Sequence, residues 1–172
     1  MDIKELYSFF CKYPKVSTDS RICIRDSIFF ALKGDRFNGN LFAEKALEIG
    51  CAYAVVDEWD DNIKNDLIIK VENVLSTLQN LSNYHRKKLK IPIIGITGTN
   101  GKTTTKELIT ISLSRKFKVA STQGNYNNHI GVPLTLLSMD KSHEIGVVEM
   151  GANHPGDIKE LCEIAEPDYG II

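Results

Sequence analysis

The sequence predicts an α/β protein: a small αβ unit over residues 1–85, followed by an incomplete, doubly wound parallel sheet over residues 86–172. Two observations carry this expectation. Short apolar runs alternate with segments of helical periodicity, which is typical of strand–helix–strand units. In addition, the apolar run IPIIGIT leads through a glycine-rich turn into another helical segment. Parallel sheets with helices on both faces are built from this pattern.

The first unit is expected to contain two helices and three strands. One face of the first helix, over 2–13, carries Ile3, Leu6, Phe9 and Phe10. The second helix, over 41–50, ends at Gly50, which can adopt the left-handed conformation of a helix C-terminus. The expected strands are 28–32, 52–57 and 67–71. Between the first strand and the second helix, the string KGDRFNGN indicates a turn.

A helix over 73–88 is expected to lead into the second unit. The strands expected there, all buried, are 91–97, 118–122, 145–150 and 169–172, and the helices are 103–115 and 156–164. The last strand reaches the final residue. Because a buried strand at the end of a domain leaves an unpaired sheet edge, we expect a fragment that can self-associate through that edge, taken from a monomeric parent.

Composition narrows the possible functions. The chain has 172 residues, 42% hydrophobic and 25% charged, with a formal net charge of −1. This balance gives no reason to expect a nucleic-acid partner or a membrane surface, and no apolar run is long enough for a membrane span. The four cysteines are far apart in the sequence, so reduced thiols in a cytoplasmic protein are expected.

The string GTNGKTT, residues 98–104, has the composition of a phosphate-binding loop. Glycines allow successive N–H groups to face one anion, and the following helix N-terminus adds positive partial charge. Lys102 can reach the β and γ phosphates, and the Thr103 hydroxyl suits Mg²⁺. The predicted nucleotide-binding residues are Gly98, Thr99, Asn100, Gly101, Lys102, Thr103 and Thr104. The GxxxxGK[ST] pattern requires glycine at position 96, where this chain has Ile96, so the spacing is a variant.

A nucleotide site also needs an acidic residue at the end of a neighbouring strand to hold the metal. Glu149 ends the apolar run IGVVEM, so Lys102 and Glu149 are the predicted catalytic residues, and Thr103 and Glu149 are the predicted Mg²⁺ ligands. A GTPase would carry aspartate at this place and an NKxD motif, and neither is present. His154, in GANHPGD, is left open between a cap for the helix beginning near Asp157 and a substrate contact.

Four strings in order resemble the Mur ligases: STDSRICIRDSIFFALKGDRFNGN, GITGTNGKTTTKELI, STQGNYNNHIGVPLTLL and VVEMGANHPGDI. The resemblance covers essentially the whole chain. It is closest to the branch that adds D-alanyl-D-alanine to UDP-N-acetylmuramoyl-tripeptide in peptidoglycan precursor synthesis. One departure lies in the first unit, where the family usually reads FDGH and this chain has Phe37-Asn38-Gly39-Asn40. The two asparagines keep hydrogen-bonding capacity but lose a possible charge.

The resemblance implies an ATP-dependent amide ligation with Mg²⁺. ATP phosphorylates the terminal carboxylate of the UDP-linked peptide, and the amine of the dipeptide then attacks the acyl phosphate. The first unit would bind UDP and residues 98–104 would bind ATP. The residues implied to contact the UDP-peptide are Ser20, Arg21, Lys33, Gly34, Asp35, Gly39, Asn127, Asn128 and His154. Asn127 and Asn128 suit the reacting end because amides bind carboxylate and phosphate oxygens without adding charge.

The resemblance also implies parts that this chain lacks. Family members carry a further metal-binding histidine, a modified lysine and a C-terminal domain after the point where this chain stops, so no ligation is expected from the chain alone. Three alternatives stay open: a folylpolyglutamate-synthase-like ligase, a nucleotide-binding module without catalysis, and a small-molecule P-loop kinase. The kinase would need an arginine-rich lid, yet Arg115 is the only arginine after residue 86.

Overall fold

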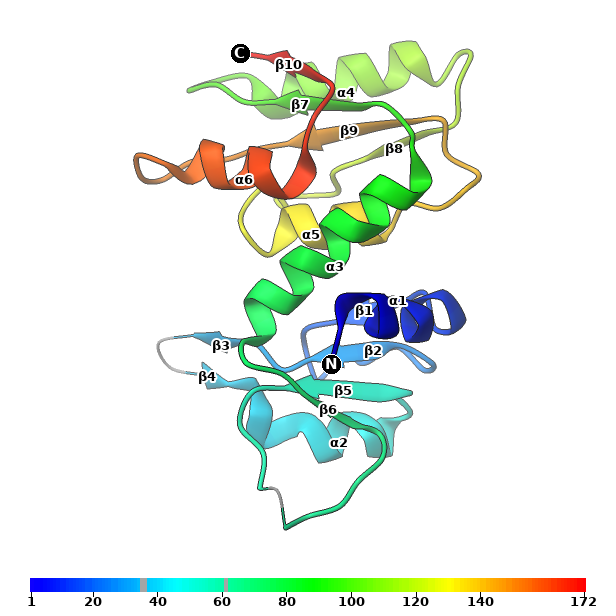
Figure 1. The fold of residues 1–172 in the computed structure, drawn as a ribbon. Helices are drawn as coiled ribbons and strands as arrows, with labels where there is room; N and C mark the ends of the chain where they lie inside the picture. Colours follow the sequence, from blue (N-terminus) through cyan, green and yellow to red (C-terminus); the bar gives the residue numbers. More distant parts are fainter. Residues whose placement is uncertain (35–36, 61) are drawn as a thin grey trace. The chain divides into compact units, whose positions relative to one another are not determined.

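The computed structural model describes residues 1–34, 37–60 and 62–172, which form two compact units, Met1–Leu81 and Ser82–Ile172. Each unit contains a four-stranded sheet in which all neighbouring strands are parallel (Figure 1). The predicted α/β fold class is therefore confirmed. The boundary between the units falls within helix α3 (Val74–Leu89).

The sheet of the first unit has the strand order β1-β2-β5-β6. Its strands are β1 (Val16–Ser17), β2 (Ile28–Phe30), β5 (Tyr53–Val56) and β6 (Ile68–Lys70). Helix α1 (Ile3–Lys12) lies on one face and α2 (Ala43–Ile49) on the other (Figure 1). Because both faces are covered, every residue of β2 is buried, as is usual in parallel sheets.

The segment between β2 and α2 positions several of the predicted substrate residues. It forms a short antiparallel hairpin, β3 (Lys33–Gly34) with β4 (Phe37–Asn38), and then a 3₁₀ turn, η1 (Gly39–Phe42). The sequence predicted only a turn here, and it also missed β1. Strands of two residues are too short to show the alternation that identifies a strand. Helix α2 ends at Gly50 with φ of 118°, as predicted.

The sheet of the second unit has the strand order β10-β7-β9-β8. Its strands are β7 (Ile93–Ile96), β8 (Val119–Ser121), β9 (Ile145–Glu149) and β10 (Tyr169–Ile171). The connecting helices are α4 (Lys102–Leu113), α5 (Gly131–Leu137) and α6 (Asp157–Ala165). Helix α4 lies on one face of this sheet and α5 with α6 on the other (Figure 1), as right-handed crossovers between these strands require. Ligands of such sheets bind beyond the carboxyl ends of the strands, where the order reverses.

Two features of the second unit differ from expectation. Helix α5 was not predicted, because GVPLTLL is short and contains Pro133, yet proline is tolerated in the first turn of a helix. Strand β10 was predicted to be buried, and this was wrong: Tyr169 is 66% and Ile171 37% exposed. It is an edge strand, and an apolar sequence does not distinguish an edge from a central position.

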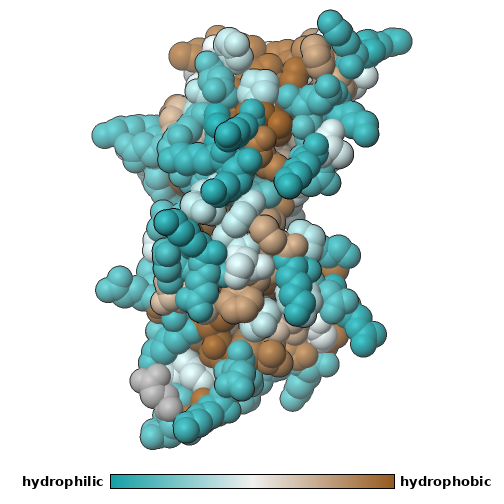
Figure 2. Space-filling model, turned by 45° about the vertical axis from the view of Figure 1, so that its right-hand side comes forward, coloured by the Kyte–Doolittle hydropathy of each residue, from teal (hydrophilic) through white to brown (hydrophobic). Residues whose placement is uncertain are grey.

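The surface agrees with a chain of ordinary polarity. Hydrophilic side chains cover much of the face in Figure 2, and hydrophobic atoms show at its upper end, the height at which β10 and α4 lie in Figure 1. The large exposed hydrophobic residues of these two elements are Leu108, Ile111, Tyr169 and Ile171. Within the described part of the chain, no helix combines the length and hydrophobicity needed to cross a bilayer.

Candidate functional site

The glycine-rich loop joins the end of β7 to the start of α4 and carries the predicted nucleotide-binding residues. Gly98 has φ of 136° and Gly101 has φ of 79°, a region in which side-chain-bearing residues are strained. An added Cβ at Gly101 would meet no heavy atom within 4 Å, so backbone conformation, not crowding, requires glycine there. Helix α4 begins at Lys102, and its N-terminus presents the free N–H groups that favour an anion.

The side chains of this loop are available to a ligand. Thr99, Asn100 and Thr104 are exposed. The Nζ of Lys102 donates to the carbonyl oxygen of Gly98 at 2.7 Å, so the amino group lies over the loop rather than away from it. A lysine held in this way can transfer its hydrogen bond from a carbonyl to a phosphate oxygen.

Glu149 is the centre of the polar cluster beside the loop. Strand pairing sets Glu149 opposite Ile96, so the carboxylate lies at the sheet edge from which the loop leaves. Its Oε2 accepts a hydrogen bond from Thr103 Oγ1 at 3.0 Å, and its Oε1 accepts one from Asn127 Nδ2 at 2.9 Å. The residue is 2% exposed. The structure therefore brings together three residues predicted as separate site members.

These residues fit a magnesium-nucleotide. A threonine hydroxyl and a carboxylate oxygen 3.0 Å apart are hard oxygen ligands of the kind that Mg²⁺ prefers. Mg²⁺ in nucleotide sites is bound by one or two protein oxygens together with substrate phosphates. The described residues contain no cluster of three or more His, Cys, Asp or Glu side chains placed to hold a metal. Thr103 and Glu149 would hold the ion here, with the loop holding the phosphates.

Asn128 follows Asn127 in the sequence and His154 lies in the loop after β9, and the two residues have different local roles. Asn128 Oδ1 accepts hydrogen bonds from the backbone N–H groups of Ile130 and Gly131, at the start of α5. His154 is exposed, and its backbone N–H donates to Asp157 Oδ2 at 2.9 Å. Backbone hydrogen bonds from Asn153 and His154 lower the pKa of Asp157. The carboxylate of Asp157, not the imidazole, therefore orders this turn.

In the first unit, Ser20 and Arg21 form a tight turn with Asp19. Ser20 is buried, and the guanidinium of Arg21 binds both carboxylate oxygens of Asp19, at 2.7 Å to Oδ2 through Nη2. The side-chain and backbone hydrogen bonds from Arg21 lower the pKa of Asp19 to about 2. Because the Arg21 side chain is 84% exposed, it remains open to an anionic ligand on its outer side.

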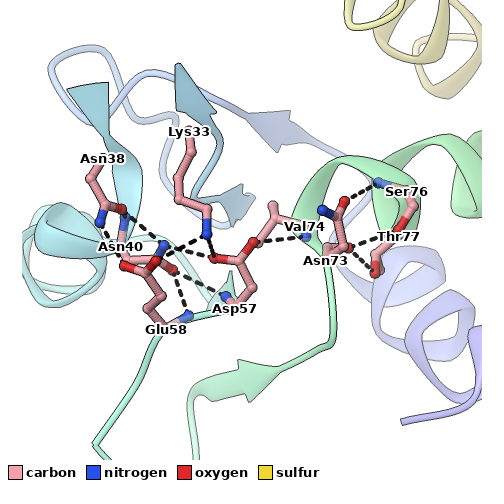
Figure 3. A network of polar contacts seen from close by, with 9 residues as sticks. All are labelled: Lys33, Asn38, Asn40, Asp57, Glu58, Asn73, Val74, Ser76 and Thr77. Atoms are coloured by element: carbon pink, nitrogen blue, oxygen red, sulfur yellow. Dashed lines mark hydrogen bonds and ion pairs between the residues drawn. The ribbon is translucent and has the colours of Figure 1, made fainter. Parts of the chain in front are cut away.

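Lys33 belongs to a second polar cluster, which joins the β3–β4 hairpin to the end of β5 (Figure 3). Its Nζ lies 3.1 Å from Asp57 Oδ1 and 3.0 Å from Glu58 Oε1. Asn38 Nδ2 donates to Glu58 Oε2 at 2.6 Å. Asn40 is 6% exposed; its Nδ2 donates to Asp57 Oδ1, and its Oδ1 accepts from the backbone N–H groups of Asp57 and Glu58.

This cluster perturbs the pKa of its charged groups. Burial raises the pKa of Asp57, but hydrogen bonds from Asn40, Lys33 and the Val74 N–H outweigh burial and lower it overall. Hydrogen bonds from Asn38 and then Lys33 lower the pKa of Glu58. Glu58 and then Asp57 raise the pKa of Lys33. The two asparagines that depart from the family pattern thus act as neutral donors toward carboxylates.

Three further predicted substrate residues lie on the same segment. Gly34 is exposed on the hairpin, and an added Cβ would meet nothing within 4 Å. Gly39 is buried, and an added Cβ would lie 2.5 Å from the Leu32 carbonyl oxygen, so packing alone requires this glycine. Asp35 lies outside the described residues.

A cavity of about 430 Å³ lies on the surface of the first unit next to Asn40 and Glu58. Its lining residues are Asn40, Leu41, Glu44, Glu58, Trp59, Asp60 and Ile63. The size is within the range of small-molecule pockets. Three carboxylates in the lining disfavour a diphosphate, so any diphosphate contact in this unit is expected at Arg21 or Lys33 instead.

Sequence reasoning missed several polar residues that support these clusters. Lys106 and Thr122 are linked to Glu149 by hydrogen bonds. Lys106 Nζ donates to the Thr122 carbonyl oxygen, and Thr122 Oγ1 accepts from the Glu149 N–H. Asp57 and Glu58 hold Lys33. Asp57 could have been found, since it ends the apolar run AYAVVD at a strand terminus. Nothing in the sequence marks Lys106 as buried.

Similarity to known proteins decides the family. Residues 96–172 match the Mur ligase middle domain. Over 161 residues the chain is 42% identical to the UDP-N-acetylmuramoyl-tripeptide--D-alanyl-D-alanine ligase of Bacillus subtilis, covering 91% of this chain. The chain belongs to the Mur ligases. The Synechocystis ligase of the same name is 40% identical over 158 residues, again covering 91% of this chain.

Solved Mur ligase structures share the fold of this chain. MurF from Acinetobacter baumannii superposes with a TM-score of 0.84 at 36% identity, covering 91% of this chain and 34% of that one. MurF from Thermotoga maritima in complex with ADP gives a TM-score of 0.80 at 37% identity, covering 90% of this chain and 36% of that one. The chain spans 35% of the length of the two curated relatives it matches.

Proposed function

We propose that this Mur ligase chain belongs to an ATP-dependent ligase that adds D-alanyl-D-alanine to UDP-N-acetylmuramoyl-tripeptide through an acyl phosphate. The first unit would bind the UDP-peptide, and the second unit would bind ATP and Mg²⁺. The observation that carries the proposal is the cluster of Thr103, Asn127 and Glu149 beside a glycine-rich loop, in a chain 42% identical to a ligase of that name. Such a reaction belongs to the cytoplasm, where nucleotide-linked precursors are made.

The residues of the second unit can be assigned roles on this basis. The backbone of residues 98–101 and the N-terminus of α4 would hold the phosphates, and Lys102 Nζ would move from Gly98 O to a phosphate oxygen. Thr103 and Glu149 would bind Mg²⁺, which neutralises charge as the phosphoryl group is transferred. Asn127 would face the reacting carboxylate end of the peptide. Asn128, the next residue, and His154, in the loop after β9, would contact the same end.

In the first unit, the proposed UDP contacts are Ser20, Arg21, Lys33, Gly34, Asp35 and Gly39. Arg21 and Lys33 are the cations of this group, and each is paired with a carboxylate. A diphosphate would compete with those carboxylates for the same donors. Gly39 would act through the shape of the segment, because its buried position leaves no room for a side chain.

The chain alone is proposed not to complete the ligation. Its relatives are about three times as long, and their remaining segments would supply the rest of the site. We propose that the parent ligase is monomeric and that the exposed edge strand β10 drives concentration-dependent association of this chain. Sedimentation across a range of concentrations measures this association, and a monomer at every concentration would refute it.

Calorimetric titration tests the proposed function. The chain is titrated with UDP-N-acetylmuramoyl-tripeptide, and separately with a non-hydrolysable ATP analogue with and without Mg²⁺. Binding of both ligands, with Mg²⁺ tightening the nucleotide only, supports the assignment. Failure of the UDP-peptide with retained nucleotide binding would leave a generic nucleotide-binding module. Peptide-bond formation by the purified chain would refute the claim that it is inactive alone.

A further inference from the structure

Helix α4 carries a lysine whose side chain is buried. Lys106 is 2% exposed, and among the described residues of α4 it is the only one that is buried. Lysine is almost never fully buried unless it is paired, because removing its amino group from water is costly. An apolar residue would pack α4 on the sheet without that cost. Packing alone therefore does not explain why a lysine occupies this position, and the contacts of its amino group must be considered.

The amino group of Lys106 contacts two oxygen atoms, one exposed to solvent and one buried. Its Nζ donates to the Thr122 carbonyl oxygen at 2.8 Å and lies 2.8 Å from Glu107 Oε1. The Glu107 side chain is 56% exposed, so water competes for that ion pair and it contributes little. Thr122 is fully buried, so the bond to its carbonyl oxygen is sheltered from solvent.

Thr122 is also hydrogen-bonded to strand β9, at Val147 and Glu149. The Thr122 N–H donates to the carbonyl oxygen of Val147 on β9 at 3.0 Å, and Thr122 Oγ1 accepts a hydrogen bond from the Glu149 N–H at 2.9 Å. Lys106, Thr122 and Glu149 are therefore joined by two consecutive hydrogen bonds through the interior of the second unit, a chain called the relay below.

Helix α4 reaches Glu149 by two routes. Thr103, three residues before Lys106 and on the same side of the helix, donates directly to the Glu149 carboxylate. The relay from Lys106 reaches the Glu149 backbone instead. The direct route uses the same two oxygens that would bind Mg²⁺. The relay from Lys106 uses neither of those oxygens, so binding of the ion would leave its hydrogen bonds unchanged.

We propose that Lys106 is a positioning residue for the magnesium site. It holds Thr122, and through it Glu149, so that the carboxylate keeps its place opposite Thr103 when both bind the ion. This inference rests on the proposed function only for the identity of the ligand. The relay itself is a property of the folded chain and can be measured without ligand.

The test compares Lys106→Met, which keeps the length of the side chain, with Lys106→Arg, which keeps its charge and donor capacity. The readout is the magnesium enhancement, the ratio of the ADP dissociation constant in EDTA to that in Mg²⁺. For Lys106→Met we expect the enhancement to fall about tenfold, the range of lost outer-shell partners, with ADP affinity in EDTA unchanged. Lys106→Arg restores part of it. Lys141→Met, at an exposed loop lysine, is the matched control and retains the wild-type ratio.

A second readout needs no nucleotide. Amide exchange of the Glu149 N–H, followed by NMR, is expected to accelerate about tenfold or more in Lys106→Met, because its acceptor Thr122 loses the hydrogen bond to its own carbonyl oxygen. If the wild-type chain binds no nucleotide, the proposed function fails, and the exchange rate alone decides whether the relay exists.

A folded Lys106→Met variant with wild-type magnesium enhancement and wild-type Glu149 exchange overturns the proposal and leaves Lys106 a packing residue. If Lys106→Met does not fold, Thr122→Val is used instead. This substitution removes the hydroxyl that accepts from the Glu149 N–H and leaves Lys106 unchanged. A folded Thr122→Val variant that keeps the wild-type enhancement likewise overturns the proposal.

Discussion

Thr103 Oγ1 lies 3.0 Å from Glu149 Oε2, joining the first turn of α4 to the end of β9 across 46 residues of sequence. The pairing of Ile96 with Glu149 in adjacent strands makes this contact possible, because it puts the carboxylate beside the glycine-rich loop. A hydroxyl and a carboxylate at this distance can bind one cation together, and more tightly than either group alone.

This relationship predicts that the Thr103 hydroxyl supports magnesium-dependent nucleotide binding. Thr103→Val keeps the shape of the side chain and removes the oxygen. We expect the magnesium enhancement of ADP binding to fall about tenfold, with binding in EDTA unchanged, in calorimetric titrations. Thr103→Ser keeps the hydroxyl and serves as the control. An unchanged enhancement in the valine variant would mean that Thr103 is not a ligand.

Two glycines of the predicted substrate segment are expected to differ in their effect on stability. In Gly39→Ala the new Cβ would lie 2.5 Å from the Leu32 carbonyl oxygen, so the backbone must shift, and we expect the free energy of unfolding to fall by about 2 kcal/mol or more. In Gly34→Ala the Cβ meets nothing within 4 Å, and the change should stay within about 0.5 kcal/mol. Urea denaturation measures both, and equal losses would contradict the packing argument.

The cluster around Asp57 predicts a loss of stability in acid. Hydrogen bonds lower the pKa of Asp57 below its ordinary value of 3.8 in the folded chain, so the unfolded chain binds the proton more readily. The stabilisation is therefore present above the unfolded pKa and is lost as pH falls through the folded pKa. We expect the urea midpoint to drop between about pH 5 and pH 3.

The contribution of Asp57 to this acid sensitivity can be isolated by substitution. Asp57→Asn removes the titrating group, so its urea midpoint should be lower than wild type at pH 7 and should fall less steeply toward pH 3. Asp66→Asn, at an exposed aspartate of the same unit, is the control and should follow the wild-type curve. Parallel curves for wild type and Asp57→Asn would show that Asp57 does not contribute to the acid sensitivity.

The thiol of Cys11 is expected to be alkylated before that of Cys51. Burial raises the pKa of Cys51 to about 12, so almost no thiolate exists near neutral pH, whereas Cys11 is exposed. At pH 8, iodoacetamide should modify Cys11 within the time in which Cys51 stays unmodified, as followed by peptide mass spectrometry. In urea both should react at similar rates. Early modification of Cys51 in the native chain would contradict its burial.

Much of the candidate nucleotide site follows from the sequence alone. The apolar run before Gly98 and the glycines of the loop predict a strand, a tight turn and a helix, and α4 begins one residue before its predicted start. Glu149 was expected at a strand end beside the loop, and it lies there. These inferences succeed because they depend on backbone geometry and on neighbours close in sequence. The alternation of strands and helices determined the α/β class for the same reason.

Only the tertiary structure decided which partner each polar side chain takes. Lys106 could have been a solvated helix residue, yet the packing of α4 on the sheet buries it against Thr122. Asn127 and Asn128 are adjacent and chemically identical, but the first donates to Glu149 and the second accepts from the Gly131 N–H at the start of α5. Strand β10 looks as apolar as β9, yet it lies at a sheet edge and is exposed along its length. The partner of each side chain depends on residues far away in the sequence, and the exposure of β10 depends on strand order. Local sequence patterns contain no information about distant neighbours or about strand order.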